Sequence, residues 1–427
     1  GRPGVGAVMG SKNLKAIVIK GDKKIDQFDA SHFKAFHNEI ISKFKADSKE
    51  TPSVLREYGT SYGVGVMNSY GILPTKNFQK GTYENWEKIN ANVLKKNHLI
   101  RNKACFACPI GCGRFTEVKT PGFEGKGEGP EYETIYALGS NCMVDNFSAV
   151  VKANYLCNEL GLDTITMGAT IACAMELNEK GYLSEKIIGS PLTWGDAKAL
   201  VDLTRMTAYR EGFGDWLAEG SFHLAKRVGH PELAMVAKKQ EFAGYDPRGI
   251  QGMGLAYATS PIGGSHMRGD PAYFEIFGHP VKIDPFEWKG KAKLVKISQD
   301  LSCIFDSAGL CIFFAARNLV SPNLEMEPIP IQKYLNAATG AEYSLEELQQ
   351  AGERIFNAER VFLVRAGFTG ADDTLPDRLT KVPMPDGPAK GHVCHLDEML
   401  EEYYPERGWD ENGIPQADTL ERLGLQL

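Results

Sequence analysis

The sequence predicts a mainly α-helical protein that is divided into two helical domains. Apolar residues recur at helical spacing over most of the chain beyond residue 26, and loops rich in glycine and proline separate these segments. With 427 residues, of which 43% are hydrophobic and 24% charged, the chain is long enough to bury more than one core. A glycine–proline break at residues 229–231 marks the boundary, so we expect domains over 26–230 and 231–427.

The individual elements can be assigned in order along the chain. A β-branched run over residues 15–20 predicts a strand. Apolar positions beginning at Phe147 mark one face of a helix that ends at Gly161, and a second helix over 165–180 ends at Gly181. The most conspicuous glycine-rich loops are expected over 120–130 and 245–264. Further helices are expected over 194–211, 213–227, 287–300, 345–366 and 396–404.

Charge and cysteine usage exclude several classes of protein. The net charge of −6 gives no reason to expect nucleic acid or an anionic membrane as a partner. No apolar run of about 18 residues is free of charge; the best candidates, 160–177 and 301–320, contain Asp163, Asp306 and Arg317 and indicate buried core. Nine cysteines and no visible signal peptide favour a reducing, cytoplasmic location. The chain opens in mid-motif without methionine, so we expect that further sequence precedes it.

Three closely spaced cysteines form the strongest functional signal. Cys105, Cys108 and Cys112 follow the pattern C-x2-C-x3-C, which places three thiolates within reach of one metal centre. Cys311, far downstream, is a candidate fourth ligand, and four thiolates are what a cubane iron–sulfur cluster needs. The alternative is a structural zinc site, although such sites usually contain two cysteine pairs or a cysteine–histidine pairing.

Two segments resemble each other across the chain. One runs from Asp306 to Cys311 in the pattern D-x-x-G-L-C, and the other runs from Asn158 to Asp163 in the pattern N-x-x-G-L-D. A carboxylate in such a turn accepts hydrogen bonds from a heterocycle, while glycine lets the backbone come close to the ligand. The alternative is a pair of ordinary turns at helix C-termini, where glycine is common.

The glycine-rich start of the chain does not match a dinucleotide-binding fingerprint. Its glycines at positions 4, 6 and 10 miss the G-x-G-x-x-G spacing, and the expected strand at 15–20 follows them where a helix is required. We therefore reject a Rossmann-type site.

Three side chains at the ends of the glycine-rich loops are candidates for proton transfer. Glu131 and Glu133 follow the first loop, and His266 follows the second. Glutamate and histidine are natural proton-transfer groups when a loop brings them to a ligand. The alternative is that they are solvated polar residues of surface loops.

Together these segments resemble the aldehyde ferredoxin oxidoreductase family, the tungsten- or molybdenum-dependent bis-pterin enzymes. Residues 1–21 are similar to the segment that closes the family's β-rich N-terminal domain, and the other motifs follow in the family's order. The resemblance covers most of residues 1–320 and fades beyond them. It implies two helical domains packed around a cofactor site, preceded by residues 1–25 as the remnant strand of an N-terminal pterin-covering domain that is otherwise missing.

The resemblance also implies a set of ligands. The four cysteines would hold a [4Fe–4S] cluster, and the two similar turns would each bind one pterin of the tungsten or molybdenum centre, with no protein ligand to that metal. Asn158 stands where the family usually has aspartate. The implied cofactor-binding residues are Arg2, Ala7, Asn158, Gly161, Leu162, Asp163, Arg268, Asp306, Gly309 and Leu310.

The reaction implied by the resemblance is oxidation of an aldehyde to a carboxylate, with electrons leaving through the cluster to ferredoxin. Glu131 or, preferably, Glu133 would act as base on the attacking water, and His266 would orient the aldehyde oxygen. The expected partners are ferredoxin or a similar acceptor and a small aldehyde, with a homodimer as one arrangement and with neither nucleic acid nor membrane. Two alternatives stay open: a related reductase of aromatic acyl-CoA or 2-oxoacids, and a non-catalytic electron-transfer or zinc-stabilised helical module.

Overall fold

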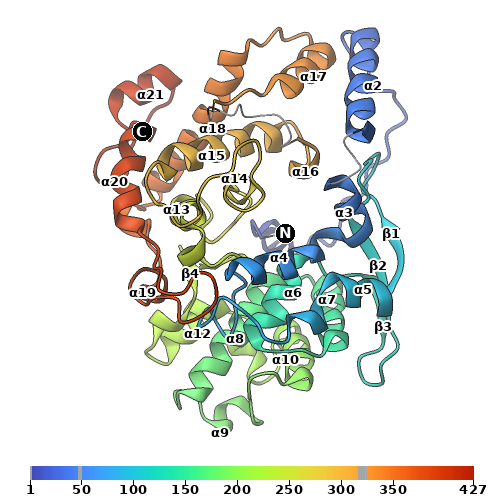
Figure 1. Ribbon diagram of the computed structural model, residues 1–427, viewed down its shortest axis with the longest axis vertical. Coiled ribbons are helices and arrows are strands. Elements are labelled where there is room, and N and C mark those ends of the chain that lie inside the picture. The colour runs from blue at the N-terminus through green and yellow to red at the C-terminus, as the bar shows by residue number, and fades with distance from the viewer. Residues whose placement is uncertain (1, 47–50, 316–322, 324) are drawn as a thin grey trace.

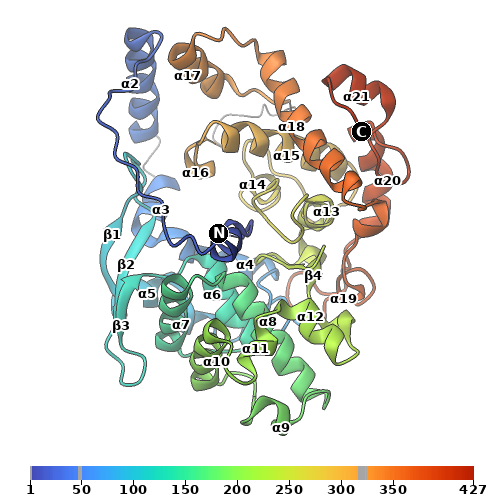
Figure 2. The same ribbon diagram turned by 180° about the vertical axis from the view of Figure 1, so that it is seen from behind.

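The structure, a computed structural model, describes residues 2–46, 51–315, 323 and 325–427. It is mainly helical, as predicted, with one three-stranded and one two-stranded sheet among these residues. Figures 1 and 2 show two groups of helices, one running from blue through teal to lime and the other from yellow to red, with the N-terminal end of the chain between them.

The first group of helices is built around α8, which is buried over most of its length. Its N-cap is Asp163, whose carboxylate accepts hydrogen bonds from the N–H groups of Ile165 and Thr166. Helices α6 and α12 pack against α8, and α10 packs against α7. The bounds are α4 Gly63–Tyr70, α5 Ala91–Asn97, α6 Tyr132–Leu138, α7 Phe147–Leu160, α8 Thr164–Glu179, α9 Glu185–Ile188, α10 Ala197–Tyr209, α11 Gly214–Leu217 and α12 Gly220–Arg227.

A three-stranded antiparallel sheet covers one flank of this group. Its strands are β1 Leu99–Lys103, β2 Gly113–Val118 and β3 Gly125–Glu128, in the order β1-β2-β3. The loop expected over 120–130 was partly wrong, because residues 125–128 form strand β3. Strand β3 needs glycine where it crosses α7, because a Cβ at Gly125 would come within 2.8 Å of the Tyr155 ring. The loop between β1 and β2 carries the cysteine triplet.

The second group of helices surrounds α15. Helices α13, α18 and α20 pack against it, and α16 follows it directly. The bounds are α13 Gln251–Thr259, α14 Ala272–Glu275, α15 Lys291–Ser307, α16 Ile312–Ala315, α17 Ile329–Thr339, α18 Leu345–Arg365, α19 Asp377–Thr380, α20 Leu396–Arg407 and α21 Ala417–Leu423. A small hairpin of β4 Val236–Ala237 and β5 Gln240–Glu241 lies between the two groups.

Helix α13 corrects the second predicted loop, 245–264. Every residue of this helix is buried, and its glycines serve close packing. A Cβ at Gly252 would lie 2.8 Å from Glu275 Oε2, and one at Gly254 would lie 2.4 Å from Cys394 Sγ. The segment expected as one helix over 213–227 is likewise split into α11 and α12, because Gly220 adopts a left-handed φ of +82°.

The predicted strand over residues 15–20 is absent. The segment has no regular structure, and Val18 and Ile19 are 92% and 87% exposed. A strand needs a partner strand, and none of the described residues pairs with this one. A short helix, α1 Val5–Ser11, instead occupies the glycine-rich start, and α2 Ala30–Ala46 and α3 Thr51–Tyr58 follow. The absent strand was one of the two grounds for rejecting a Rossmann-type site, so the rejection now rests on the glycine spacing alone.

The described residues form two hydrophobic cores. The larger joins residues of both predicted domains, such as Ile72 and Tyr136 from the first and Phe242 and Tyr257 from the second. The smaller lies entirely within 231–427, beneath α15 and α18. Within the part of the chain that the structure describes, no helix is both long and apolar enough to cross a bilayer. Residues 316–320 of the stretch that we assigned to core lie outside the described residues.

Gly168 controls how closely α8 approaches α6, the helix that carries Glu133. A Cβ at this position would lie 2.4 Å from the backbone carbonyl of Ala137. Helix propensity favours alanine over glycine by about 1 kcal/mol, but such a backbone clash costs about 1–3 kcal/mol or more. We therefore expect Gly168→Ala to lower the free energy of unfolding, measured from urea denaturation. Gly10→Ala, on an open face of α1, is the control and should leave the free energy of unfolding unchanged or raise it by up to about 1 kcal/mol.

Candidate functional site

The candidate proton-transfer residues meet where α6 begins. Glu131 is the N-cap residue of α6 and Glu133 lies in its first turn. Two residues apart on a helix point to nearly opposite sides. Glu133 Oε1 therefore faces His266, with 3.7 Å to Nε2, while Glu133 Oε2 accepts the N–H of Gly244 at 2.8 Å. Glu131 instead accepts a hydrogen bond from the Thr60 hydroxyl.

Glu133 and His266 each have a buried polar atom that lacks a partner. The two side chains are 15% and 17% exposed, and neither Glu133 Oε1 nor His266 Nδ1 makes a hydrogen bond. Leaving a buried polar atom unsatisfied costs about 1–3 kcal/mol. Such atoms are uncommon in folded proteins and call for an explanation, of which a ligand or water is the simplest.

Burial gives this pair unusual protonation states. Burial raises the pKa of Glu133 to about 8, although the Gly244 N–H and the charge of Arg2 oppose the shift. Burial, together with Arg2, lowers the pKa of His266 to about 3. At neutral pH the pair is thus a carboxylic acid beside a neutral imidazole. A carboxyl group with this pKa gains and loses a proton close to physiological pH, as a catalytic acid or base must.

Aromatic residues hold the loop that supports Glu133. The hydroxyl of Tyr132 donates to the carbonyl of Gly244, and the Tyr245 ring centroid lies 5.9 Å from that of His266. Gly244 permits this packing, because a Cβ there would lie 2.8 Å from the Tyr136 ring. A second buried carboxyl, Asp270, has its pKa raised by burial to about 7.

Arg2 connects the N-terminal segment to both groups of helices. Its guanidinium donates to the Asp163 carboxylate at 2.9 Å and to the carbonyls of Glu241 and Gly264 at 2.5 and 2.8 Å. Burial alone would raise the pKa of Asp163, but Arg2 and Thr166 lower it below its usual value, so the group is ionised at neutral pH. Arg2 and Asp163, both predicted to bind cofactor, are thus hydrogen-bonded to each other although they lie 161 positions apart in the chain.

The two similar turns have the same backbone geometry. Gly161 and Gly309 adopt φ values of 76° and 70°, and the N–H groups of Leu162 and Leu310 each return 2.9 Å to a carbonyl five residues earlier. This is the Schellman pattern that ends many helices. The local conformation by itself therefore fits both a ligand-binding turn and an ordinary turn at a helix C-terminus. A Cβ at either glycine would meet nothing within 4 Å, which leaves open space beside both turns.

The residues around the turns differ in their contacts. Arg268 Nη1 lies 3.4 Å from the Asp306 carboxylate and 3.7 Å from that of Glu359. Asn158 is exposed at the end of α7, and Ala7 lies on the exposed helix α1. The structure thus brings together Arg2 with Asp163 and Arg268 with Asp306, but it gives Ala7 and Asn158 no comparable anchoring contact.

The four candidate cluster cysteines are electrostatic neighbours. Burial raises the pKa of Cys112 to about 11, with further contributions from Glu131 and from Cys311, Cys108 and Cys105. Four thiols from two segments match the donor set of a cubane cluster. Among the described side chains, however, no three of the histidine, cysteine, aspartate and glutamate type converge closely enough to hold one metal ion. The cluster therefore stays a prediction.

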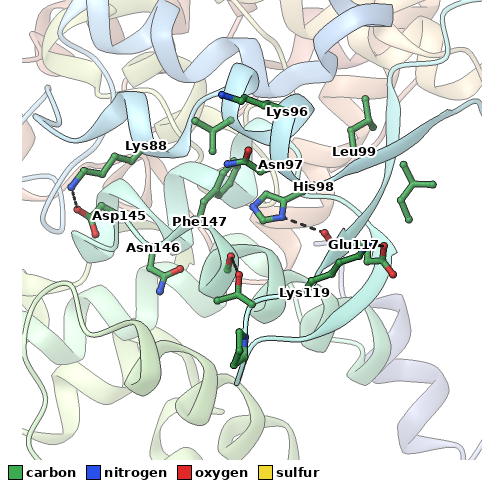
Figure 3. Close-up of a pocket in the computed structure, with 15 residues that line it drawn as sticks. Lys88, Lys96, Asn97, His98, Leu99, Glu117, Lys119, Asp145, Asn146 and Phe147 are labelled. Atoms are coloured by element: carbon green, nitrogen blue, oxygen red, sulfur yellow. Dashed lines mark hydrogen bonds and ion pairs between the residues drawn. The ribbon is translucent and has the colours of Figure 1, made fainter.

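An open pocket lies away from these residues. It has a volume of about 770 Å³, is lined by residues of β1, β2, α5 and the start of α7, and contains none of the predicted site residues. Figure 3 shows Lys88 paired with Asp145 at 2.5 Å and the His98 ring directed at the Glu117 carbonyl. Its polar groups are largely satisfied by one another, so we do not place the reaction there.

Comparison with known proteins decides the family. A model described as "Aldehyde ferredoxin oxidoreductase, domains 2 & 3" matches residues 36–425. The chain belongs to the aldehyde ferredoxin oxidoreductase family. The resemblance inferred from the motifs is thereby confirmed, and so is the expectation of an enzyme. Only its extent was wrong, because the match to the family does not fade after residue 320.

Relatives support this assignment over the whole chain. The tungsten-containing aldehyde ferredoxin oxidoreductases of Pyrococcus furiosus and Thermococcus kodakarensis are each 44% identical over 429 residues, which is all of this chain and 69% of theirs. An aliphatic sulfonate oxidoreductase, WOR-like subunit, of Pyrococcus furiosus is 28% identical over 440 residues and is covered to 66%. The active-site complex BamBC of benzoyl-coenzyme A reductase shares the fold, with a TM-score of 0.76 at 20% identity over 99% of this chain and 69% of that one.

For this family member, sequence reasoning missed several residues that build the site. Thr60, Tyr132, Gly244, Tyr245 and Asp270 were not predicted, although all of them support or border Glu131, Glu133 and His266. The one available signal was a glycine between aromatic residues near position 244, which is typical of close packing. The other contacts join segments far apart in the chain and leave no local pattern.

Proposed function

We propose that this member of the aldehyde ferredoxin oxidoreductase family oxidises aldehydes to carboxylates at a tungsten or molybdenum bis-pterin centre. Electrons would leave through a [4Fe–4S] cluster to ferredoxin in the cytoplasm. The names of the relatives support the tungsten, the aldehyde and the ferredoxin. The single observation that carries the proposal is the buried pair of Glu133 and His266, two proton-transfer groups that lie 3.7 Å apart and that each have a buried atom without a hydrogen-bond partner.

The residues present match the types of group that the proposed cofactors need, although no three described metal-binding side chains converge on one point in this structure. Two open turns with left-handed glycines, each beside an arginine–carboxylate contact, suit the binding of two flat heterocycles. Arg2 and Arg268 would then supply hydrogen bonds to the pterins, and the four cysteines would hold the cluster. When bound, the metal centre supplies the two-electron redox step and the cluster supplies a one-electron path. The division into 1–25, 26–230 and 231–427 is proposed with it.

The chain's own residues would handle the protons and the position of the substrate. Converting an aldehyde and water to a carboxylate releases two electrons and three protons. Glu133 would accept a proton from the attacking water at Oε1, the oxygen that has no partner, while the Gly244 N–H holds Oε2 in place. His266 would orient the aldehyde oxygen through Nε2, since the neutral ring can donate one hydrogen bond. Glu131 would instead have a structural role near the cluster cysteines, holding the Thr60 hydroxyl that accepts the Tyr132 N–H.

A direct assay tests the proposal. The protein is purified anaerobically with its cofactors and supplied with a panel of aliphatic and aromatic aldehydes, with benzyl viologen as electron acceptor. We expect aldehyde-dependent dye reduction, together with bound tungsten or molybdenum. Aromatic acyl-CoA thioesters, 2-oxoacids and aliphatic sulfonates serve as comparison substrates. Turnover of one of these without aldehyde turnover would replace the proposed reaction, and zinc with no iron or sulfide would end the cluster proposal.

A further inference from the structure

The loop that carries the cysteine triplet ends in an exposed aromatic residue. Phe106, between Cys105 and Cys108, is fully exposed at 102%. Ala107 adopts a left-handed φ of 53°, and the N–H of Cys108 bonds to the carbonyl of Cys105 at 3.1 Å, which closes a tight turn. This turn directs Phe106 outward, away from the core. A phenyl ring presented in this way is typical of the apolar centre of an interface.

The strand that leads into this loop is also exposed. In the order β1-β2-β3, strand β1 lies at the edge, so its outer N–H and C=O groups have no strand partner in the described sheet. Four of its five residues are exposed, including Ile100 at 43%. Ile100 on the edge strand and Phe106 in the loop that follows it are thus both exposed, and we call this strand and loop, residues 99–112, the cysteine-loop tip.

Positive charge surrounds the cysteine-loop tip. Arg101, Lys103 and Lys126 on β1 and β3 are exposed, although Lys103 is paired with Glu128 at 2.5 Å and the whole chain has a net charge of −6. Arg101 and Lys126 lie 4.9 and 6.0 Å from the centroid of the Phe115 ring, and both are exposed. Arg101 and Lys103 are two residues apart on β1, which places them on one face of the strand. The tip thus has an apolar centre with a cationic rim.

We propose that the cysteine-loop tip is the docking surface for a small, acidic electron-carrier protein. This inference rests on the proposed function, because it requires a cluster at Cys105, Cys108, Cys112 and Cys311. A carrier seated on Phe106 would come next to Cys105, which is itself exposed. Each docking would transfer one electron from the reduced cluster to the oxidised carrier, so that two carriers are reduced for each aldehyde oxidised.

The chemistry of the tip favours such a partner over others. An apolar centre with a polar rim suits a protein surface, and a cationic rim attracts an acidic one and accelerates its association. Encounters between electron-transfer proteins bury little area and are weak, so a few exposed residues suffice. Because the rim charges are exposed, the association should weaken as ionic strength rises above about 0.1 M.

The test uses the cofactor-loaded enzyme with an acidic ferredoxin and, separately, with benzyl viologen. In Arg101→Glu/Lys126→Glu, we expect the KM for ferredoxin at low salt to rise about tenfold or more, since rim charges act mainly on association. The rate with viologen should be unchanged. Lys186→Glu/Lys226→Glu is the matched control: it changes the charge equally, on α9 and α12, which lie away from the sheet in Figures 1 and 2. It should leave both rates unchanged.

A second variant, Phe106→Ser, tests the apolar centre without altering charge. It should raise the KM for ferredoxin while the iron content and the viologen-dependent rate stay the same. Ferredoxin binding measured by titration calorimetry should weaken in parallel. An unchanged KM for ferredoxin in both variants would overturn the docking surface. An equal loss of the viologen-dependent rate would overturn it too, because it would identify an internal contact. So would a shift from dimer to monomer in sedimentation, because it would identify a contact between two copies of this chain. Failure of the proposed function looks different: the unaltered enzyme binds ferredoxin but shows no aldehyde-dependent dye reduction.

Discussion

Replacing Glu133 by glutamine is expected to lower kcat for aldehyde oxidation by about 10²–10⁴-fold, the usual contribution of a general base. Glutamine keeps the size of the side chain and accepts the Gly244 N–H, but it cannot take a proton from water. The matched control is Glu131→Gln, two residues away on the other side of α6, which should change kcat by less than about tenfold. Both are measured as viologen reduction with saturating aldehyde. Equal losses in the two variants would contradict the assignment of the base.

The pH dependence follows from the same residue. Burial raises the pKa of Glu133 to about 8, so the deprotonated form that can act as a base increases as pH rises from 7 to 9. The rate of the unaltered enzyme should increase over this range, and the residual rate of Glu133→Gln should not. His266, with a pKa lowered to about 3, stays neutral throughout and adds no second transition. A pH profile that is the same in both proteins would show that another group titrates.

Replacing the proposed cluster cysteines should lower the rate of turnover about as much as replacing Glu133. In Cys105→Ala and in Cys311→Ala we expect loss of iron and sulfide and a fall of ferredoxin-linked turnover by more than about 10²-fold, because the only one-electron path is broken. Cys311→Ala should also reduce the amount of bound pterin, since this residue directly follows the turn at Gly309. Iron, sulfide and pterin are measured on the purified proteins, with electron paramagnetic resonance of the reduced cluster.

The control for the cysteine variants is Cys303→Ala. Cys303 is buried inside α15, about two helical turns before the turn at Gly309, and has no place in the proposed cluster. This variant should keep its iron and its cluster spectrum, with only a modest loss of stability. If the spectrum survives in Cys105→Ala and Cys311→Ala as well, the four-cysteine assignment is wrong.

The sequence predicts helices well where periodicity and end signals agree. Helices α7 and α8 lie within one or two residues of their predicted bounds, because Asp163 and Gly161 are strong local signals. The prediction of secondary structure is wrong where glycine is needed for close packing rather than for a turn. The glycines of α13 and β3 resemble loop residues, yet they lie where another side chain would clash with Glu275 or Tyr155.

At the site, too, features set by neighbouring residues could be predicted from the sequence, and contacts between distant segments could not. Motif spacing identifies the residue types, and the twin turns at Gly161 and Gly309 have the common geometry that their patterns suggest. Which groups meet depends on how the two groups of helices pack. Spacing cannot show that Glu133 faces His266 while Glu131 faces Thr60. The orientation of α6 decides this, and close packing at Gly168 sets that orientation.

The hydrogen bonds of Arg2 have a consequence for the order of folding. They join residues that are 161, 239 and 262 positions apart in the chain, and they contact both groups of helices. Contacts of such long sequence separation carry a large loop-closure entropy and form late. Neither group of helices alone can offer Arg2 all its partners. The N-terminal segment should therefore settle last, and it should be the first to exchange its amide hydrogens with solvent in the native protein.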